Sequence, residues 1–260
     1  MRIKQSLCLP IYHPEGMGLD EMLGLCAEIG FAAVEIWSRD ETFGELADAA
    51  RRHGLTIASM CGHQFPLEDG LNKRANHDRI EQELRESIDL AVRHGIPGLI
   101  CFSGNRQPHQ SEVEAIEATA DGLRRVAPYA EQKGVNLNME LLNSKIDHAG
   151  YQCDHTAWGL AVCEKVGSPR VKLLYDIYHM QIMEGDLIRT IRENIGRIGH
   201  FHTAGNPGRR DMDDTQELNY AGICRAIAET GYDLYVGHEF NPKGDPIEAL
   251  RRAYDICNQG

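Results

Sequence analysis

The feature that most constrains the fold is an alternation of short β-rich runs with longer amphipathic stretches, repeated eight times. The starts of successive β-rich runs lie about 33 residues apart. Strands that alternate with helices in this way predict a parallel sheet covered by helices. Eight such pairs in 260 residues predict an α/β chain that forms a single (β/α)8 barrel domain over residues 1–260.

The predicted strands are Ile3–Leu9, Ala33–Trp37, Thr56–Gly62, Gly98–Ser103, Val135–Leu141, Val171–Tyr178, Ile198–Thr203 and Asp233–Phe240. The predicted helices span roughly 19–29, 43–53, 76–94, 111–133, 155–166, 184–195, 218–230 and 246–257. A doubly wound open sheet is the alternative. It is disfavoured because Pro10–Gly16, after the first strand, contains no glycine-rich phosphate-binding pattern.

The net charge limits the kinds of partner that we expect, and the cysteines indicate the cellular compartment. The formal net charge of -12 argues against nucleic acid or an anionic membrane surface as a partner, since either needs a basic patch. Eight cysteines are scattered without a CxxC pair, which indicates reduced thiols in a cytoplasmic protein. No apolar run is long enough for a membrane span or a secretory signal. Assembly into a homo-oligomer is left open.

Four consecutive predicted strands, the fifth to the eighth, end in an ionisable side chain. Parallel neighbouring strands would bring these ends together at the mouth of the barrel, where active sites of this fold lie. Three carboxylates and one imidazole converging there need a cation to offset their repulsion. Oxygen-rich ligands favour Mg²⁺ or Mn²⁺, with Co²⁺ as a substitute. The four predicted metal ligands are Glu140, Asp176, His202 and Glu239.

Further side chains are candidates to bind the substrate around this mouth. Arg209 follows a Pro-Gly turn and could hold an anionic or polyhydroxylated substrate by paired hydrogen bonds. His200 lies two residues before His202 on the same face of the strand, so either histidine could be the ligand. The predicted substrate-binding residues are His179, Arg209, His63 and Trp37, and Glu35 could line the opposite wall together with Trp37 and His63.

Essentially the whole chain resembles a known family, and the resemblance is densest from Glu140 onward. The runs that carry the resemblance are Tyr175–Gln181, Ile198–His200, Pro207–Arg209, Glu217–Tyr220 and Gly231–Glu239. They are similar to the hydroxypyruvate isomerase family, within the xylose isomerase-like TIM barrels that also include ketose 3-epimerases and endonuclease IV. The family is expected to bind a divalent metal through the four residues above, and the resemblance casts Glu140 and Glu239 as the acid/base pair.

Two residues depart from the pattern of the isomerases. His202 stands where they often have Gln and the ketose 3-epimerases have His, and Gln216 replaces a usual Gly. These two departures concern the substrate and leave the expected metal chemistry unchanged. The resemblance implies that a proton is removed from the carbon next to a carbonyl, which gives an ene-diolate stabilised by the metal. The expected substrate is a small hydroxy-keto acid or a ketose. Conversion of hydroxypyruvate to tartronate semialdehyde is the first expectation. A 3-epimerase and a keto-sugar dehydratase are the alternatives, and a DNA-repair nuclease and a non-catalytic sugar-binding module are hypotheses from other classes.

Overall fold

A computed structural model of the chain describes residues 2–64 and 66–259. Eight parallel strands form one sheet in the order β1-β8-β7-β6-β5-β4-β3-β2, and Cys8 bridges to Glu35 beside β1 and β2. The predicted (β/α)8 barrel is confirmed. The strands are β1 Lys4–Leu7, β2 Ala33–Glu35, β3 Thr56–Cys61, β4 Gly98–Cys101, β5 Asn136–Glu140, β6 Val171–Asp176, β7 Ile198–Thr203 and β8 Tyr235–His238.

Each predicted helix has a counterpart among the described residues. The helices are α1 Leu9–Tyr12, α2 Leu19–Ile29, α3 Phe43–Arg52, α4 His77–His94, α5 Glu112–Arg124, α6 Ala127–Lys133, α7 Thr156–Val166, α8 Ile177–Met183, α9 Leu187–Asn194, α10 Tyr220–Glu229 and α11 Pro246–Cys257, with 3-10 turns at Arg74–Asn76 and Ile195–Arg197.

Two predicted elements differ from the structure for local reasons. The stretch 111–133 is two helices, α5 and α6, because Pro128 in the first turn of α6 has no N–H and its ring would clash with the carbonyl of residue 124. The sixth strand ends at Asp176 rather than Tyr178. Its carboxylate accepts the backbone N–H of His179 and so caps α8.

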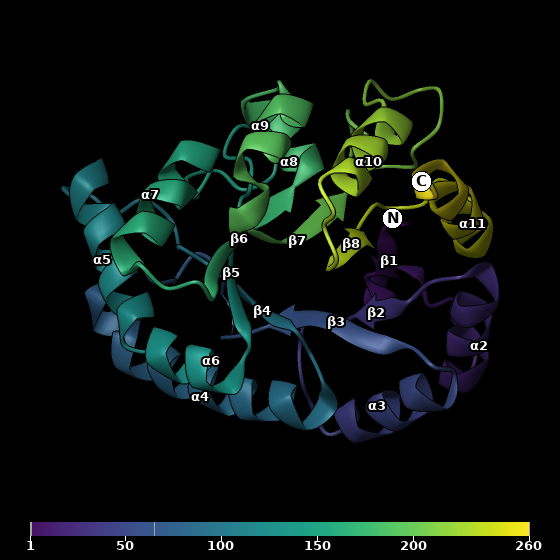
Figure 1. The fold of residues 1–260 in the computed structure, drawn as a ribbon, viewed down its shortest axis with the longest axis horizontal. Helices are drawn as coiled ribbons and strands as arrows, with labels where there is room; N and C mark the ends of the chain where they lie inside the picture. Colours follow the sequence, from purple (N-terminus) through teal and green to yellow (C-terminus); the bar gives the residue numbers. More distant parts are fainter. Residues whose placement is uncertain (1, 65, 260) are drawn as a thin grey trace. The chain divides into compact units, whose positions relative to one another are not determined.

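Backbone contacts divide the chain into two compact units. The first comprises Met1–Met60, Asp186–Ile195 and His200–Gly260. Within it, strands β1, β2 and β8 lie together, and helix α2 packs on α3 while α10 packs on α9 and α11 (Figure 1). Its core includes Leu7, Met22, Phe201, Val236 and Leu250, none of which is exposed.

The second unit comprises Cys61–Gly185 and Gly196–Gly199. Within it, α4 packs on β4, α6 on β5 and α7 on β6, as the blue-to-teal part of Figure 1 shows. Strand β5 reads Asn-Leu-Asn-Met-Glu and is buried along its whole length. A carboxylate at the end of such a strand loses hydration, and burial of this kind needs a compensating partner.

All eight cysteines are buried thiols that form no disulfide among the described residues. Among the described residues, the helices include none with both the length and the apolarity to cross a bilayer. The single domain over residues 1–260 stays a prediction. Its two end residues lie outside the described part of the chain.

Candidate active site

In the first unit, the carboxylate of Glu35 holds two histidines of β7. Glu35 ends β2, and its Oε2 lies 3.0 Å from Nε2 of His200 and 3.0 Å from Nε2 of His202. The other oxygen, Oε1, accepts the hydroxyl of Ser6. Glu35 and both rings are buried. Glu35 is therefore an internal partner of the two histidines, and its expected place on the opposite wall of the site stays a prediction.

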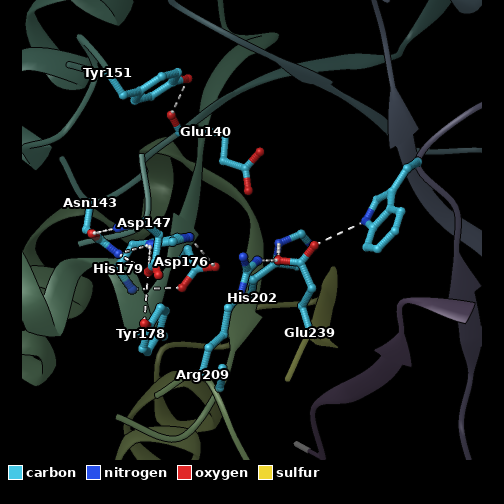
Figure 2. Close-up of polar contacts among 12 residues, drawn as sticks. Glu140, Asn143, Asp147, Tyr151, Asp176, Tyr178, His179, His202, Arg209 and Glu239 are labelled. Carbon is cyan, nitrogen blue, oxygen red and sulfur yellow. Dashed lines mark hydrogen bonds and ion pairs between the residues drawn. The ribbon is translucent and has the colours of Figure 1, made fainter. Parts of the chain in front are cut away.

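Glu239 follows β8, and three side chains of the same unit contact its carboxylate. Nδ1 of His202 lies 3.3 Å from Oε2 of Glu239. The indole N–H of Trp37 donates to Oε1 at 3.1 Å, and the guanidinium of Arg209 donates to Oε2 (Figure 2). Three of the predicted site residues, Trp37, His202 and Arg209, thus meet at one carboxylate.

Arg209 reaches Glu239 from an uncommon backbone conformation. Its φ of 55° lies in the left-handed region, which a residue with a side chain seldom adopts. The N–H of Asn241 donates to the Arg209 carbonyl at 2.8 Å and holds the turn. The guanidinium of Arg210, by comparison, donates to the carbonyl of Pro242 at 3.3 Å, and the residue is exposed.

The neighbouring charges in this unit favour an ionised Glu35 beside a protonated His202. Burial alone would raise the pKa of Glu35, but the adjacent His200 and His202 lower it far below the usual range. Burial alone would lower the pKa of His202, but Glu239 and Glu35 raise it well above its usual value. His202 is therefore strongly basic, and it lies between two carboxylates.

Gly237 makes room for this arrangement. It pairs with His202 in the register of β7 and β8. A Cβ at this position would lie 2.1 Å from Oε1 of Glu35 and 3.1 Å from the His202 ring. Only glycine at this position leaves room for the Glu35 carboxylate, so Gly237 helps to position His202.

In the second unit, Glu140 and Asp176 end β5 and β6. Both are buried. The backbone carbonyl of Glu140 accepts the hydroxyl of Tyr151 at 3.1 Å, which fixes the end of the strand. One oxygen of Asp176 is used as the cap of α8, and its Oδ2 lies 3.7 Å from Nε2 of His179.

His179 is completely buried, where the sequence suggested a residue at the rim. Its Nδ1 lies 2.6 Å from the amide nitrogen of Asn143. That amide nitrogen also donates to Asp147 at 2.6 Å, and Tyr178 donates to the same carboxylate oxygen at 2.8 Å (Figure 2).

His63 lies elsewhere in the second unit. It is buried, and its Nε2 accepts the backbone N–H of Phe102 at 2.9 Å. Burial lowers the pKa of His63 to about 4, which keeps the ring neutral. A role for His63 in substrate binding stays a prediction.

Sequence reasoning passed over Asn143, Asp147, Ser6 and Gly237. Asn143 carried a weak signal, because it stands three residues after Glu140 in the loop that leaves the strand. Ser6 and Gly237 carried none, since what they do depends on neighbours far away in the chain.

Within the first unit, the buried side chains of Cys8, Glu35 and His202 offer ligand atoms within 4.8 Å of one another, so they form one group that could hold a metal ion.

Comparison with known proteins gives relatives along nearly the whole chain. A Homo sapiens protein provisionally named a hydroxypyruvate isomerase is 32% identical, with 95% of this chain and 93% of that protein covered. A 2-oxo-tetronate isomerase of Cupriavidus necator is 30% identical, with 93% of this chain and 94% of that protein covered. These findings confirm the resemblance to hydroxypyruvate isomerases.

Solved structures share the fold. A structure described as an AP endonuclease, family 2, from Brucella melitensis is 27% identical with a TM-score of 0.80, covering 96% of this chain and 97% of that one. A D-psicose 3-epimerase of Clostridium cellulolyticum H10 also has a TM-score of 0.80, with 98% of each chain covered, and its 18% identity speaks for the fold alone. The family model described as xylose isomerase-like TIM barrel matches residues 23–257, and the chain belongs to this family.

Proposed function

We propose that the protein is a divalent-metal-dependent isomerase of small hydroxy-keto acids, converting hydroxypyruvate to tartronate semialdehyde. The observation that carries this proposal is the set of ionisable side chains at the ends of β5, β6, β7 and β8, four neighbours in the sheet order. Relatives named as isomerases of keto acids cover the same length of chain. The free cysteines suit a cytoplasmic enzyme.

The donor set of the proposed metal site is Glu140, Asp176, His202 and Glu239. Three carboxylates and one imidazole match Mg²⁺ or Mn²⁺. His202 is favoured over His200 because its Nδ1 faces Glu239 while its Nε2 is engaged by Glu35, as in metal sites where a carboxylate orients the ligating histidine. When bound, the metal supplies a positive charge that stabilises negative charge developing on the substrate oxygens.

Two carboxylates move the proton in the proposed reaction. One of Glu140 and Glu239 removes the hydrogen on the carbon next to the carbonyl, which leaves an ene-diolate. Return of the proton to the adjacent carbon, with transfer of the hydroxyl proton from its oxygen to the former carbonyl oxygen, completes an isomerisation. Return to the opposite face of the same carbon by the second glutamate would complete an epimerisation instead.

Arg209 favours the keto acid over the neutral ketose as substrate. Its guanidinium donates to Glu239 from a turn held by Asn241. It therefore lies beside a proposed catalytic carboxylate, where a substrate would bind. A guanidinium binds a substrate carboxylate through two parallel hydrogen bonds, which a neutral ketohexose cannot match. Trp37 bounds the same region through its bond to Glu239.

A single incubation tests the reaction class and the substrate. Protein loaded with Mn²⁺ is incubated in D₂O with hydroxypyruvate, tartronate semialdehyde and common ketoses, and followed by NMR. We expect deuterium at the exchanging carbon and interconversion of the two three-carbon acids. Epimers of a ketose would favour the alternative, and a product lighter by one water would indicate a dehydratase. No exchange with any substrate would reject the isomerase proposal.

The metal site is tested separately. We expect anomalous diffraction signal from Mn²⁺ soaked into crystals at Glu140, Asp176, His202 and Glu239. Signal at other residues, or none, would reject this ligand set whatever the substrate.

A further inference from the structure

The side-chain amide of Asn143 is fully buried and makes four hydrogen bonds. Its Oδ1 accepts the backbone N–H of Ile146 at 2.9 Å and of Asp147 at 3.0 Å. Its nitrogen lies 2.6 Å from Oδ2 of Asp147 and 2.6 Å from Nδ1 of His179. An amide has two acceptor sites and two N–H donors, so every site is used.

Three of these bonds fix the orientation of the amide without reference to His179. If the oxygen and nitrogen were exchanged, the NH₂ group would face two backbone N–H donors. The amide oxygen would then face the carboxylate of Asp147, which already accepts the hydroxyl of Tyr178 at 2.8 Å. Each of these contacts would be repulsive in a buried site. The group facing His179 is therefore an N–H donor.

The tautomer of His179 follows from this donor. Nδ1 lies 2.6 Å from the amide nitrogen and 3.9 Å from Oδ2 of Asp147, so the amide and not the carboxylate is within hydrogen-bond distance. A ring nitrogen that accepts an N–H carries no proton of its own, so this contact favours a neutral ring with its single proton on Nε2. Nε2 lies on the side of the ring that faces Asp176, 3.7 Å from its Oδ2. The N–H of His179 thus points to the carboxylate that the proposed function assigns to the metal.

We propose that Asn143 is a positioning residue that holds His179 as the neutral Nε2–H tautomer, so that His179 donates a hydrogen bond to a substrate oxygen beside Asp176. The donation to substrate rests on the proposed function, whereas the tautomer does not. A donor fixed beforehand stabilises charge that develops on the substrate oxygen without having to reorient. His179 is in this role a hydrogen-bond donor and not a base.

The tautomer is measured directly by NMR on the whole protein without metal or substrate. Long-range ¹H–¹⁵N correlation spectra of ¹⁵N-histidine-labelled protein distinguish Nε2–H, Nδ1–H and doubly protonated rings. The signals of His179 are identified by their loss in His179→Gln. We expect the Nε2–H pattern in the wild-type protein at neutral pH. An Nδ1–H or doubly protonated pattern would overturn the proposal. The measurement is made on the wild-type protein, so it does not depend on whether an Asn143 variant folds.

A substitution at Asn143 then tests the cause. In Asn143→Asp the carboxylate faces Nδ1 as an acceptor, and we expect the proton to appear on Nδ1. Asn194→Asp, on a half-exposed residue of α9, is the matched control and should leave the pattern unchanged. A His179 that keeps the Nε2–H pattern in a folded Asn143→Asp protein would overturn the positioning role.

The link to substrate is tested with Asn143→Ala. Loss of an outer partner of this kind lowers activity about 10–100-fold, so we expect kcat/KM to fall by that factor while the affinity for Mn²⁺ alone is unchanged. An unchanged kcat/KM would overturn the donor role. Failure of wild-type protein to bind Mn²⁺ would instead count against the proposed function and leave the tautomer result standing.

Discussion

The two units of the chain each bury a histidine near a carboxylate, and they hold it by opposite means. In the first unit the carboxylate of Glu35 lies 3.0 Å from Nε2 of His202, and the pKa of His202 is raised well above its usual value by Glu239 and Glu35. In the second unit the amide of Asn143 donates to Nδ1 of His179. A carboxylate makes a ring more basic, whereas an N–H donor keeps one nitrogen without a proton.

The difference separates two chemical tasks. A ring oriented by a carboxylate at Nε2 can offer Nδ1 to a metal that displaces the proton there, which suits a metal ligand. A ring whose Nδ1 is already occupied presents an N–H, which suits contact with an oxygen of the substrate. In the sequence both histidines lie within or just after a predicted strand, and only the partner of each ring distinguishes them.

The largest expected effect comes from the two glutamates, one in each unit. Glu140→Gln and Glu239→Gln each keep the size of the side chain but remove the base and one acceptor oxygen, so we expect turnover to fall by about 10²–10⁴. Initial rates on hydroxypyruvate measure this, with the exposed Glu28→Gln of α2 as control. A variant that keeps more than about a tenth of the wild-type rate would remove that residue from the acid/base pair.

Glu35→Gln breaks the arrangement around His202. A neutral amide does not raise the basicity of the ring, and we expect the affinity for Mn²⁺ to fall about 10–100-fold in calorimetric titration. Asn143→Ala should leave that affinity alone, so the two variants separate the two histidines. Equal affinity in Glu35→Gln and wild type would contradict the role of Glu35.

Gly237→Ala tests the same arrangement by a different route. The new Cβ would lie 2.1 Å from Oε1 of Glu35 and displace that carboxylate. We expect weaker Mn²⁺ binding again, whereas Gly44→Ala, whose Cβ meets nothing within 4 Å, should bind as the wild type does.

Arg209→Lys should discriminate between classes of substrate. Lysine keeps the charge but cannot form the paired hydrogen bonds to a carboxylate. We expect kcat/KM for a keto acid to fall about tenfold, the effect of one lost charge-assisted bond, with a smaller change for a neutral ketose. The neighbouring Arg210→Lys is the control. An equal fall for both substrates would remove the preference for keto acids.

His63 shows a third way of holding a buried histidine, and it affects stability rather than activity. Its ring accepts the N–H of Phe102, and burial lowers its pKa to about 4. Below about pH 6.5 the unfolded chain binds a proton that the folded chain does not bind until about pH 4, so the free energy of unfolding falls as pH decreases across that window. From the size of the shift, this loss is about 3 kcal/mol.

His63→Gln removes this proton uptake. We expect the free energy of unfolding, measured in urea at several pH values, to decrease less between pH 6.5 and pH 4 than in the wild type. The half-exposed His155→Gln serves as control. An unchanged pH dependence in His63→Gln would show that the ring is not held neutral.

Particular residues show how far sequence reasoning reaches. The eight strands were predictable because alternating β and helical patterns are local, and the strand Ile198–Thr203 has the predicted bounds. The division at Pro128 was missed, although proline acts on its own turn and the signal is local. The end of β6 was not predictable, because Asp176 ends the strand through a cap on α8 that the apolar pattern of Ile177 and Tyr178 conceals.

The sequence by itself determined the barrel and the positions of the charged residues at the ends of its strands, because both follow from periodicity along the chain. Only the tertiary structure decided the protonation state of each histidine. Glu35 reaches His202 across 167 positions of sequence, through space that only Gly237 leaves open, and Asn143 meets His179 across 36. The partner of a buried ring determines where its proton lies, and that partner is set by packing rather than by spacing in the sequence.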